Sequence, residues 1–153
     1  MKRWGVLAGW GIVLFTLTLL VVGATVMIRN LTQPYTFVMI GSTTVKASVA
    51  RTDAELERGL SGVDYLGENQ GKLFVFTEEG SLPMWMKDMK ISLDMIWLDS
   101  DKRIVHIERN VTPGSYPTIY ESSVPAKYVL EVPAGTVTES RIAKDGLVSF
   151  DIP

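Results

Sequence analysis

The 153-residue chain contains no cysteine. Without a thiol there are no disulfides, no thiolate metal ligands, no thiol nucleophile and no lipid attachment through cysteine, so packing alone must hold the fold. The chain also has a single histidine, His106, which leaves no second imidazole for a usual zinc site. The sequence therefore predicts no cofactor and no bound metal.

The charges are nearly balanced, with 15 basic and 17 acidic residues, and no long run of one sign occurs. Nucleic-acid-binding domains usually carry a basic patch, so no nucleic-acid partner is expected. The chain also lacks a Gly-x-Ser-x-Gly elbow and the glycine spacing of a phosphate-binding loop. Serine-nucleophile and nucleotide chemistry are therefore disfavoured.

Charged residues are absent from Trp4 to Ile28 as well. A helix over this stretch would be about 37 Å long at about 1.5 Å per residue, whereas a bilayer core is about 30 Å thick. Lys2 and Arg3 precede the stretch, and only Arg29 follows it closely. This excess of basic residues before the stretch places the N-terminus in the cytoplasm and the rest of the chain outside.

We thus expect a membrane anchor and linker over residues 1–33 and an extracytoplasmic domain over residues 34–153, with the membrane bound through residues 4–28. The alternative is a cleaved signal peptide, for which the small residues 22–24 offer a cleavage site. The apolar stretch is longer than the roughly 7–15 residues of a signal peptide, which favours the uncleaved, single-pass anchor. A cleaved chain would be secreted instead.

Runs of β-favouring residues separated by turn residues fill most of the chain after Pro34. The first two runs, 35–40 and 43–50, flank a Gly-Ser pair that is suited to a tight hairpin turn. Three later runs are expected to form an antiparallel meander at 71–76, 91–98 and 103–109. Two further runs complete the predicted sheet at 127–132 and 147–152.

Helical signals are few. Thr52 and Glu55 match a capping box, so a short helix is expected up to about Arg58. Residues 135–142 are ambiguous and can hold a helical turn, and the long loop 110–126 could cover a pocket. The sequence predicts an α+β domain, mostly antiparallel, whose small curled sheet is barrel-like or a sandwich, with one or two short helices after a single transmembrane helix.

Charged side chains interrupt the apolar runs at several positions. Asp94 lies inside the run 91–98, where a buried and unpaired carboxylate would cost several kcal/mol. The pattern suggests a pocket for a polar ligand, with an aromatic side chain as a flat contact surface. Structural ion pairs or simple exposure to solvent are the alternatives. The candidate binding residues are Arg58, Trp85, Lys87, Asp94 and Glu131.

Two carboxylates in different environments can divide acid and base roles, so Asp94 and Glu131 also allow an enzyme, although no catalytic residue is assigned. His106 alternates with polar and apolar neighbours along a strand, which favours a mixed or exposed face over a catalytic role. Three methionines between positions 84 and 89 carry thioethers that suit copper(I). Methionines at this spacing more often fill a core.

Several short motifs lie along the domain and are specific when taken together. They include Glu57-Arg58-Gly59-Leu60, Gly71-Lys72-Leu73-Phe74-Val75-Phe76, Trp85-Met86-Lys87, Leu93-Asp94, Ile104-Val105-His106, Pro125-Ala126, Tyr128-Val129-Leu130-Glu131 and Ala134-Gly135. From about Val45 to Phe150 the chain thereby resembles the domain-of-unknown-function 192 family, whose members are small and often exported or membrane-anchored. The resemblance implies a compact β-rich fold and no established activity. The chain departs from the family pattern at Lys72, usually methionine, and at Asp88, commonly asparagine.

The expected function is that of a binding or accessory module, a membrane-anchored extracytoplasmic domain with a polar pocket. Its expected partners are the membrane and an unknown small polar ligand or an envelope protein. A hydrolase or lyase that acts on an envelope component through paired carboxylates is one alternative. A structural subunit of a membrane complex is the other.

Overall fold

The computed structural model describes Phe15, Thr18 and residues 34–152. The described residues 34–152 belong to one compact unit. Phe15 and Thr18 are helical. The predicted anchor over residues 4–28 otherwise lies outside the described residues, and within the described part no helix is long and apolar enough to cross a membrane.

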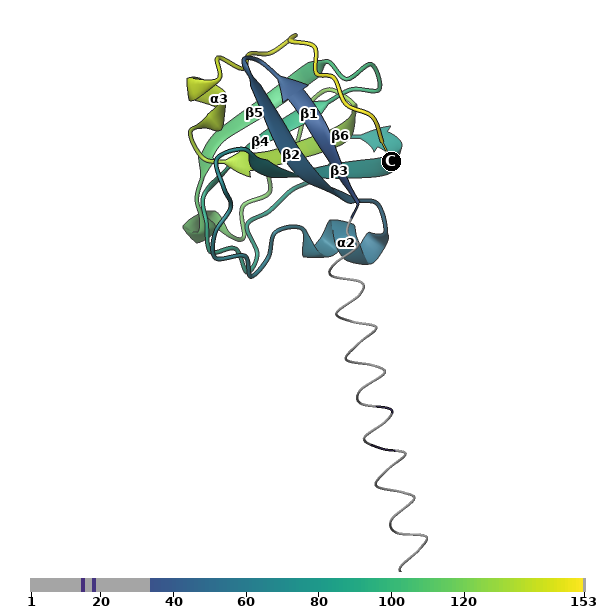
Figure 1. Cartoon of the computed structure of the whole chain (residues 1–153), viewed down its shortest axis with the longest axis vertical. Coiled ribbons are helices and arrows are strands. Elements are labelled where there is room, and N and C mark those ends of the chain that lie inside the picture. The colour runs from purple at the N-terminus through teal and green to yellow at the C-terminus, as the bar shows by residue number, and fades with distance from the viewer. Residues whose placement is uncertain (1–14, 16–17, 19–33, 153) are drawn as a thin grey trace, which may run out of the picture. The chain divides into compact units, whose positions relative to one another are not determined.

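The folded unit is built on one six-stranded sheet with two short helices (Figure 1). Its elements are β1 (Tyr35–Ile40), β2 (Thr43–Ala50), α2 (Asp53–Arg58), β3 (Gln70–Gly80), β4 (Leu93–Leu98), β5 (Ile104–Val111), a 3₁₀ turn (Pro113–Ser115), β6 (Ala126–Pro133) and α3 (Thr136–Glu139). The strand order is β1-β2-β3-β6-β4-β5. Neighbouring strands are antiparallel except β2 and β3, so the sheet is mixed and mostly antiparallel.

The parallel pair β2–β3 follows from the helix between them, since parallel neighbours need a crossover connection rather than a tight turn. The predicted capping box begins this helix. The Glu55 side chain accepts hydrogen bonds from the backbone N–H groups of Thr52 at 3.1 Å and Arg51 at 3.0 Å. Gly59, with φ +50° and ψ −126°, ends the helix in a positive-φ conformation that glycine adopts without strain.

The predicted meander is wrong in one respect, because β6 lies between β3 and β4. Strands β3 and β4 therefore do not pair with each other, although they follow one another in sequence. Each pairs with β6 instead, and all three have apolar residues on both faces. Burial on both faces explains why the sequences of these strands are nearly continuous in apolar residues and do not alternate between apolar and polar ones.

Two hydrophobic cores lie on the two faces of the sheet. The first contains Val38, Val45, Leu73, Ile96, Leu130 and Val137, and α3 contributes to it. The second contains Leu60, Phe74, Met86, Met95, Trp97 and Val129, and it is completed by residues 82–86. Successive side chains of a strand point to opposite faces, so each strand of the sheet's centre serves both cores.

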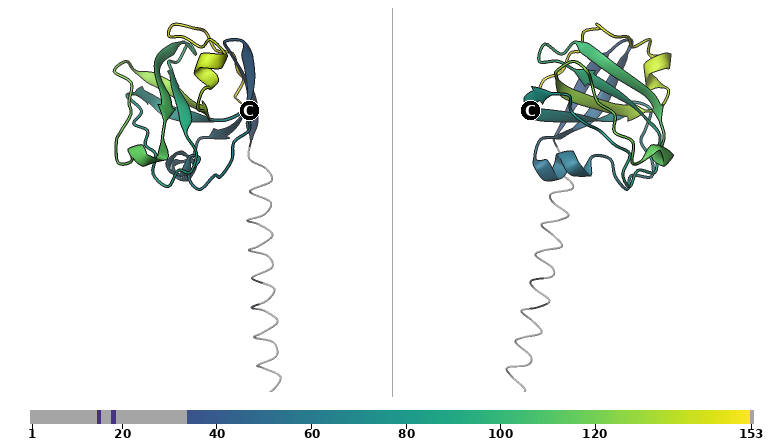
Figure 2. Two further views of the ribbon diagram at one scale, coloured as in Figure 1. Left: turned by 90° about the vertical axis from the view of Figure 1, so that its left-hand side faces the viewer. Right: turned by 180° about the vertical axis from the view of Figure 1, so that it is seen from behind.

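The C-terminal segment connects the two edge regions of the sheet (Figure 2). Ser149 exchanges two backbone hydrogen bonds with Met39 of β1, at 2.8 and 3.0 Å. Val148 donates its backbone N–H to the carbonyl oxygen of Lys102, just before β5, at 3.0 Å. The predicted last strand at 147–152 is thus reduced to isolated bridges, but it does link β1 to the start of β5.

Candidate functional site

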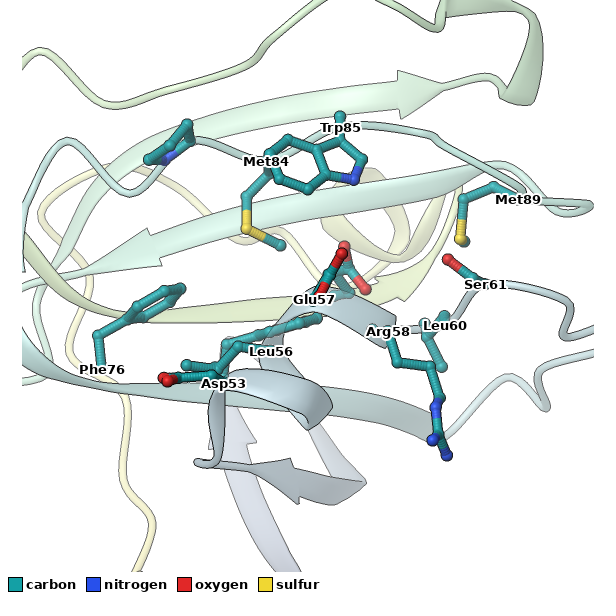
Figure 3. A pocket seen from close by; sticks show the side chains of 14 residues that line it. Asp53, Leu56, Glu57, Arg58, Leu60, Ser61, Phe76, Met84, Trp85 and Met89 are labelled. Atoms are coloured by element: carbon teal, nitrogen blue, oxygen red, sulfur yellow. The ribbon is translucent and has the colours of Figure 1, made fainter.

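A cavity of about 380 Å³ opens between α2, β3 and the segment 83–89 (Figure 3). Its apolar walls include Leu56, Phe74, Phe76, Met84, Trp85 and Met89. Its polar lining comes from Asp53, Glu57, Arg58, Ser61 and Glu131. In Figure 3 the guanidinium group of Arg58 points away from Met84 and Trp85, so this cation does not face the apolar wall.

Backbone hydrogen bonds hold the segment 83–89 in place as one wall of the cavity. Met84 and Tyr120 exchange backbone hydrogen bonds at 2.8 and 2.9 Å. At the other end, the Ser61 hydroxyl donates a hydrogen bond to the carbonyl oxygen of Lys87 at 2.9 Å. The backbone N–H of Gly62 donates to the carbonyl oxygen of Asp88, also at 2.9 Å. The long loop 110–126 thus holds one end of this wall through Tyr120.

Trp85 is the exposed aromatic side chain of this wall, at 40% exposure. Its neighbours Met84 and Met86 are buried, because alternate residues of this extended segment point toward the second core. Trp85 is left at the rim, where an aromatic ring can contact a ligand.

Glu131 lines the cavity and has an ionisable neighbour in the sheet that lies outside the lining. Glu131 on β6 lies directly opposite Lys72 on β3, and their exposed fractions are 3% and 7%. No described residue forms a hydrogen bond with Oε2 of Glu131, although this oxygen is buried. Burial raises the pKa of Glu131 from 4.5 to about 8, and the nearby Lys72 ammonium opposes this rise. Burial likewise lowers the pKa of Lys72, which Glu131 opposes in turn.

Comparison with known proteins identifies the domain. The profile of the DUF192 family, described as "Uncharacterized ACR", matches residues 36–150. The chain belongs to the DUF192 family. This membership confirms the resemblance seen in the sequence motifs.

Two solved structures are similar to this DUF192 domain. One is a crystal structure of a candidate transcription regulator from Sinorhizobium meliloti, 29% identical, with a TM-score of 0.70 over 76% of this chain and 92% of that chain. The other is a protein of unknown function from Novosphingobium aromaticivorans, 27% identical, with a TM-score of 0.70 over 75% of this chain and 83% of that chain. No curated protein matches the chain.

The structure gathers most of the predicted site residues on one side of the DUF192 domain. Arg58, Trp85 and Glu131 line the cavity. Lys87 lines an adjoining hollow of about 270 Å³, which Arg58 and Trp85 also border. Asp94 is not among these residues, because it lies on the other face of the sheet.

Asp94 is 1% exposed, and its cross-strand neighbour Val132 belongs to the first core. Its Oδ1 accepts the backbone N–H of Asn110 at 2.8 Å. Its Oδ2 accepts those of Gly135 at 3.1 Å and Val137 at 2.8 Å. Three backbone donors thus satisfy the carboxylate and join β4 to the end of β5 and the start of α3. Asp94 and Glu131 therefore do not form the paired carboxylates of the enzyme alternative.

Other residues considered from the sequence also lie apart. Met84 and Met89 line the cavity, whereas Met86 is buried in the second core, so the three methionines do not share one site. His106 Nε2 lies 2.9 Å from Oε1 of Glu108 on the same strand. Among the described residues, no group of three histidine or carboxylate side chains is placed to hold a metal ion.

Sequence reasoning missed the role of Lys72, which it noted only as a departure from the family pattern. It also missed the lining residues Leu56, Glu57 and Phe76. A charged residue inside the run 71–76 is visible in the sequence, but its partner depends on the pairing of β3 with β6. That pairing spans more than fifty residues and leaves no local signal.

Proposed function

We propose that this DUF192 domain is a binding module whose cavity takes a small ligand with an apolar body. One observation carries the proposal: a cavity with mostly apolar walls and an exposed tryptophan at its rim has a buried carboxyl group in its lining. Small-molecule sites are usually concave and apolar, with a few polar groups that orient the ligand, and range over about 300–1,000 Å³. The cavity fits this description.

The lining makes the site more apolar than the sequence suggested. Apolar surface supplies affinity, while Glu131 and the residues of α2 supply orientation. The enzyme alternative requires Asp94 and Glu131 in one site, whereas Asp94 accepts hydrogen bonds from backbone donors on the opposite face of the sheet. The balanced charge of the chain gives no reason to extend the description of the Sinorhizobium protein as a transcription regulator to this one.

The proposed module works at the outer surface of a membrane, held by residues 4–28 with its N-terminus in the cytoplasm. The support is the uncharged stretch of the sequence and the basic residues before it. Protease treatment of intact cells tests this orientation. Digestion of the domain in intact cells is expected, and digestion only after lysis would contradict it.

An interaction surface on β1 favours the structural-subunit alternative as a second candidate. Tyr35, Phe37 and Met39 alternate on the outer face of this strand, with exposed fractions of 51%, 57% and 55%. An apolar row of this kind is typical of a protein or membrane contact. If it joins copies of this chain, Phe37→Ser lowers the sedimenting mass of the full-length protein; an unchanged mass would argue against self-association.

A fragment screen tests the binding function. The full chain, in solution or in lipid nanodiscs if it requires lipid, is screened by calorimetry against small apolar compounds that carry one polar group. Met89→Trp places a larger side chain in the cavity wall and is expected to weaken binding at least tenfold. Val124→Trp, at an exposed position outside the lining, is the matched control. Equal binding to both variants would refute the assignment, as would a screen without hits.

A further inference from the structure

We propose that the cavity selects an uncharged ligand that presents a carbonyl oxygen, most simply a carboxamide, to the carboxyl group of Glu131. The inference rests on the proposed binding function and names the class of ligand. It is carried by three observations: the apolar lining, the position of Glu131 in that lining, and a buried oxygen of Glu131 without a partner among the described residues.

The lining argues against a charged ligand. The side chains of Leu56, Phe74, Phe76, Met84 and Met89 contain no hydrogen-bond donor, and the two thioethers are only weak acceptors. An ionic group that left water for this environment would lose its hydration without replacement, which is far more costly than burying a neutral group. An uncharged ligand avoids this cost and still gains from the apolar walls.

Glu131 has one ionisable neighbour in the sheet, Lys72, which does not line the cavity. Lys72 stands opposite Glu131 across the β3–β6 pair. On its other side, Glu131 faces the uncharged Met95 of β4. The segment 83–89 contributes only Pro83, Met84, Trp85 and Met89 to the lining, and none of these can be charged. An ammonium group would be repelled by the Lys72 ammonium. A carboxylate would find Lys72 outside the lining and would lose its hydration against the apolar walls.

The remaining charges belong to α2. Asp53, Glu57 and Arg58 line the cavity, and Glu55 interacts electrostatically with Lys72. The side chains of Asp53, Glu57 and Arg58 are exposed, so water screens them. A neutral ligand head need not pair with any of them.

A protonated carboxyl group matches a carboxamide. The pKa of Glu131, raised by burial to about 8, leaves this group mostly protonated at pH 7. In that form it donates one hydrogen bond through O–H and accepts another through C=O. A carboxamide presents the complementary acceptor and donor. Such a ligand would supply the partner that the buried oxygen lacks within the described residues, where an unmade bond is costly.

Three compounds with one apolar body and different heads provide the test: 3-phenylpropanamide, 3-phenylpropylamine and 3-phenylpropanoate. Each is titrated into the full chain by calorimetry at pH 6.5. The amide is expected to bind at least tenfold more tightly than the amine and the carboxylate. Its affinity is expected to fall roughly 30-fold between pH 6.5 and pH 9.5, because only the fraction of protein with protonated Glu131 can donate the bond.

Glu131→Gln separates hydrogen bonding from charge. The glutamine amide retains a donor and an acceptor but does not titrate. The variant is expected to keep the affinity for 3-phenylpropanamide within threefold and to lose its pH dependence. Glu139→Gln, at an exposed position in α3, is the control and should behave as the unmodified protein does.

The outcomes distinguish this inference from the proposed function. Tightest binding by the amine, with affinity rising above pH 8, would overturn the carbonyl assignment but leave the binding module intact. Equal affinity for all three compounds, or an unchanged pH dependence in Glu131→Gln, would also overturn it. Failure of the amide to bind while other apolar fragments bind has the same meaning. Only the absence of any fragment bound in the cavity would overturn the proposed function.

Discussion

Replacement of Glu131 by glutamine should remove most of the pH dependence of stability between pH 5 and pH 8. The pKa of Glu131 rises from 4.5 to about 8 on folding, chiefly through burial. The folded protein therefore holds a proton that the unfolded chain releases. Stability from this group is complete below about pH 4.5 and is lost as the pH rises through about 8. At about 1.4 kcal/mol per pH unit, the loss amounts to about 5 kcal/mol.

Urea unfolding of the full chain, followed by circular dichroism at pH 5, 6, 7 and 8, measures this effect. The unmodified protein should lose stability steadily over the series. Glu131→Gln should lose much less, and its advantage should grow from little at pH 5 to several kcal/mol at pH 8. Glu131 and Lys72 affect each other's pKa, so the difference between the two proteins reports the loss of Glu131 together with its effect on Lys72. Parallel pH profiles would refute the buried, protonated state of Glu131, as would a Gln variant that is less stable at pH 8.

Three further predictions test the fold. Asp94→Asn cannot accept all three backbone hydrogen bonds, because its NH₂ group must face at least one N–H donor, so the free energy of unfolding should fall by about 2–3 kcal/mol. The melting temperature should fall by roughly 10 °C. A melting temperature equal to that of the exposed control Asp101→Asn would contradict the structural role of Asp94. Gly71→Ala would place its Cβ 2.7 Å from the Glu131 carbonyl oxygen and 2.8 Å from the Val45 side chain. The free energy of unfolding, measured by urea denaturation, should fall by about 1–3 kcal/mol. Gly80→Ala, with open space around it, is the control. Residues 34–153 expressed alone should unfold cooperatively, since they form one compact unit; a requirement for detergent would count against this.

Local signals in the sequence predicted local structure well. The hairpin runs 35–40 and 43–50 coincide with β1 and β2, because a tight turn fixes the pairing of its flanking strands. The capping box of Thr52 and Glu55 is present at the start of α2. These features depend on residues a few positions apart, and such short-range geometry can be read from the chain.

Long-range pairing was not predictable in the same way. The insertion of β6 between β3 and β4 determines that Glu131 faces Lys72. The sequence showed both charges inside apolar runs but not that they meet. Side-chain alternation then places Asp94 and Glu131 on opposite faces, since Glu131 pairs with Met95 and not with Asp94. A one-residue difference in register would have reversed this result.

Asp94 shows how burial can be predicted while its purpose is not. An acidic residue in an apolar strand needs partners, and the sequence correctly marked it as unusual. Its donors are backbone N–H groups of residues 110, 135 and 137, which carry no side-chain signature. Side-chain patterns suggest cations or ligands for such a carboxylate, because backbone donors cannot be seen in them.

The central claim, that the cavity between α2, β3 and the segment 83–89 binds a ligand, can be tested most directly through the methionine methyl groups. Met84 and Met89 line the cavity, and Met39 is exposed on β1 as an internal control. The full chain, labelled with ¹³C at the methionine methyls, is titrated with the tightest compound found by calorimetry. We expect the Met84 and Met89 resonances to shift in proportion to binding while that of Met39 stays in place. Saturation without a shift at Met84 and Met89, or a shift at Met39 alone, would contradict it.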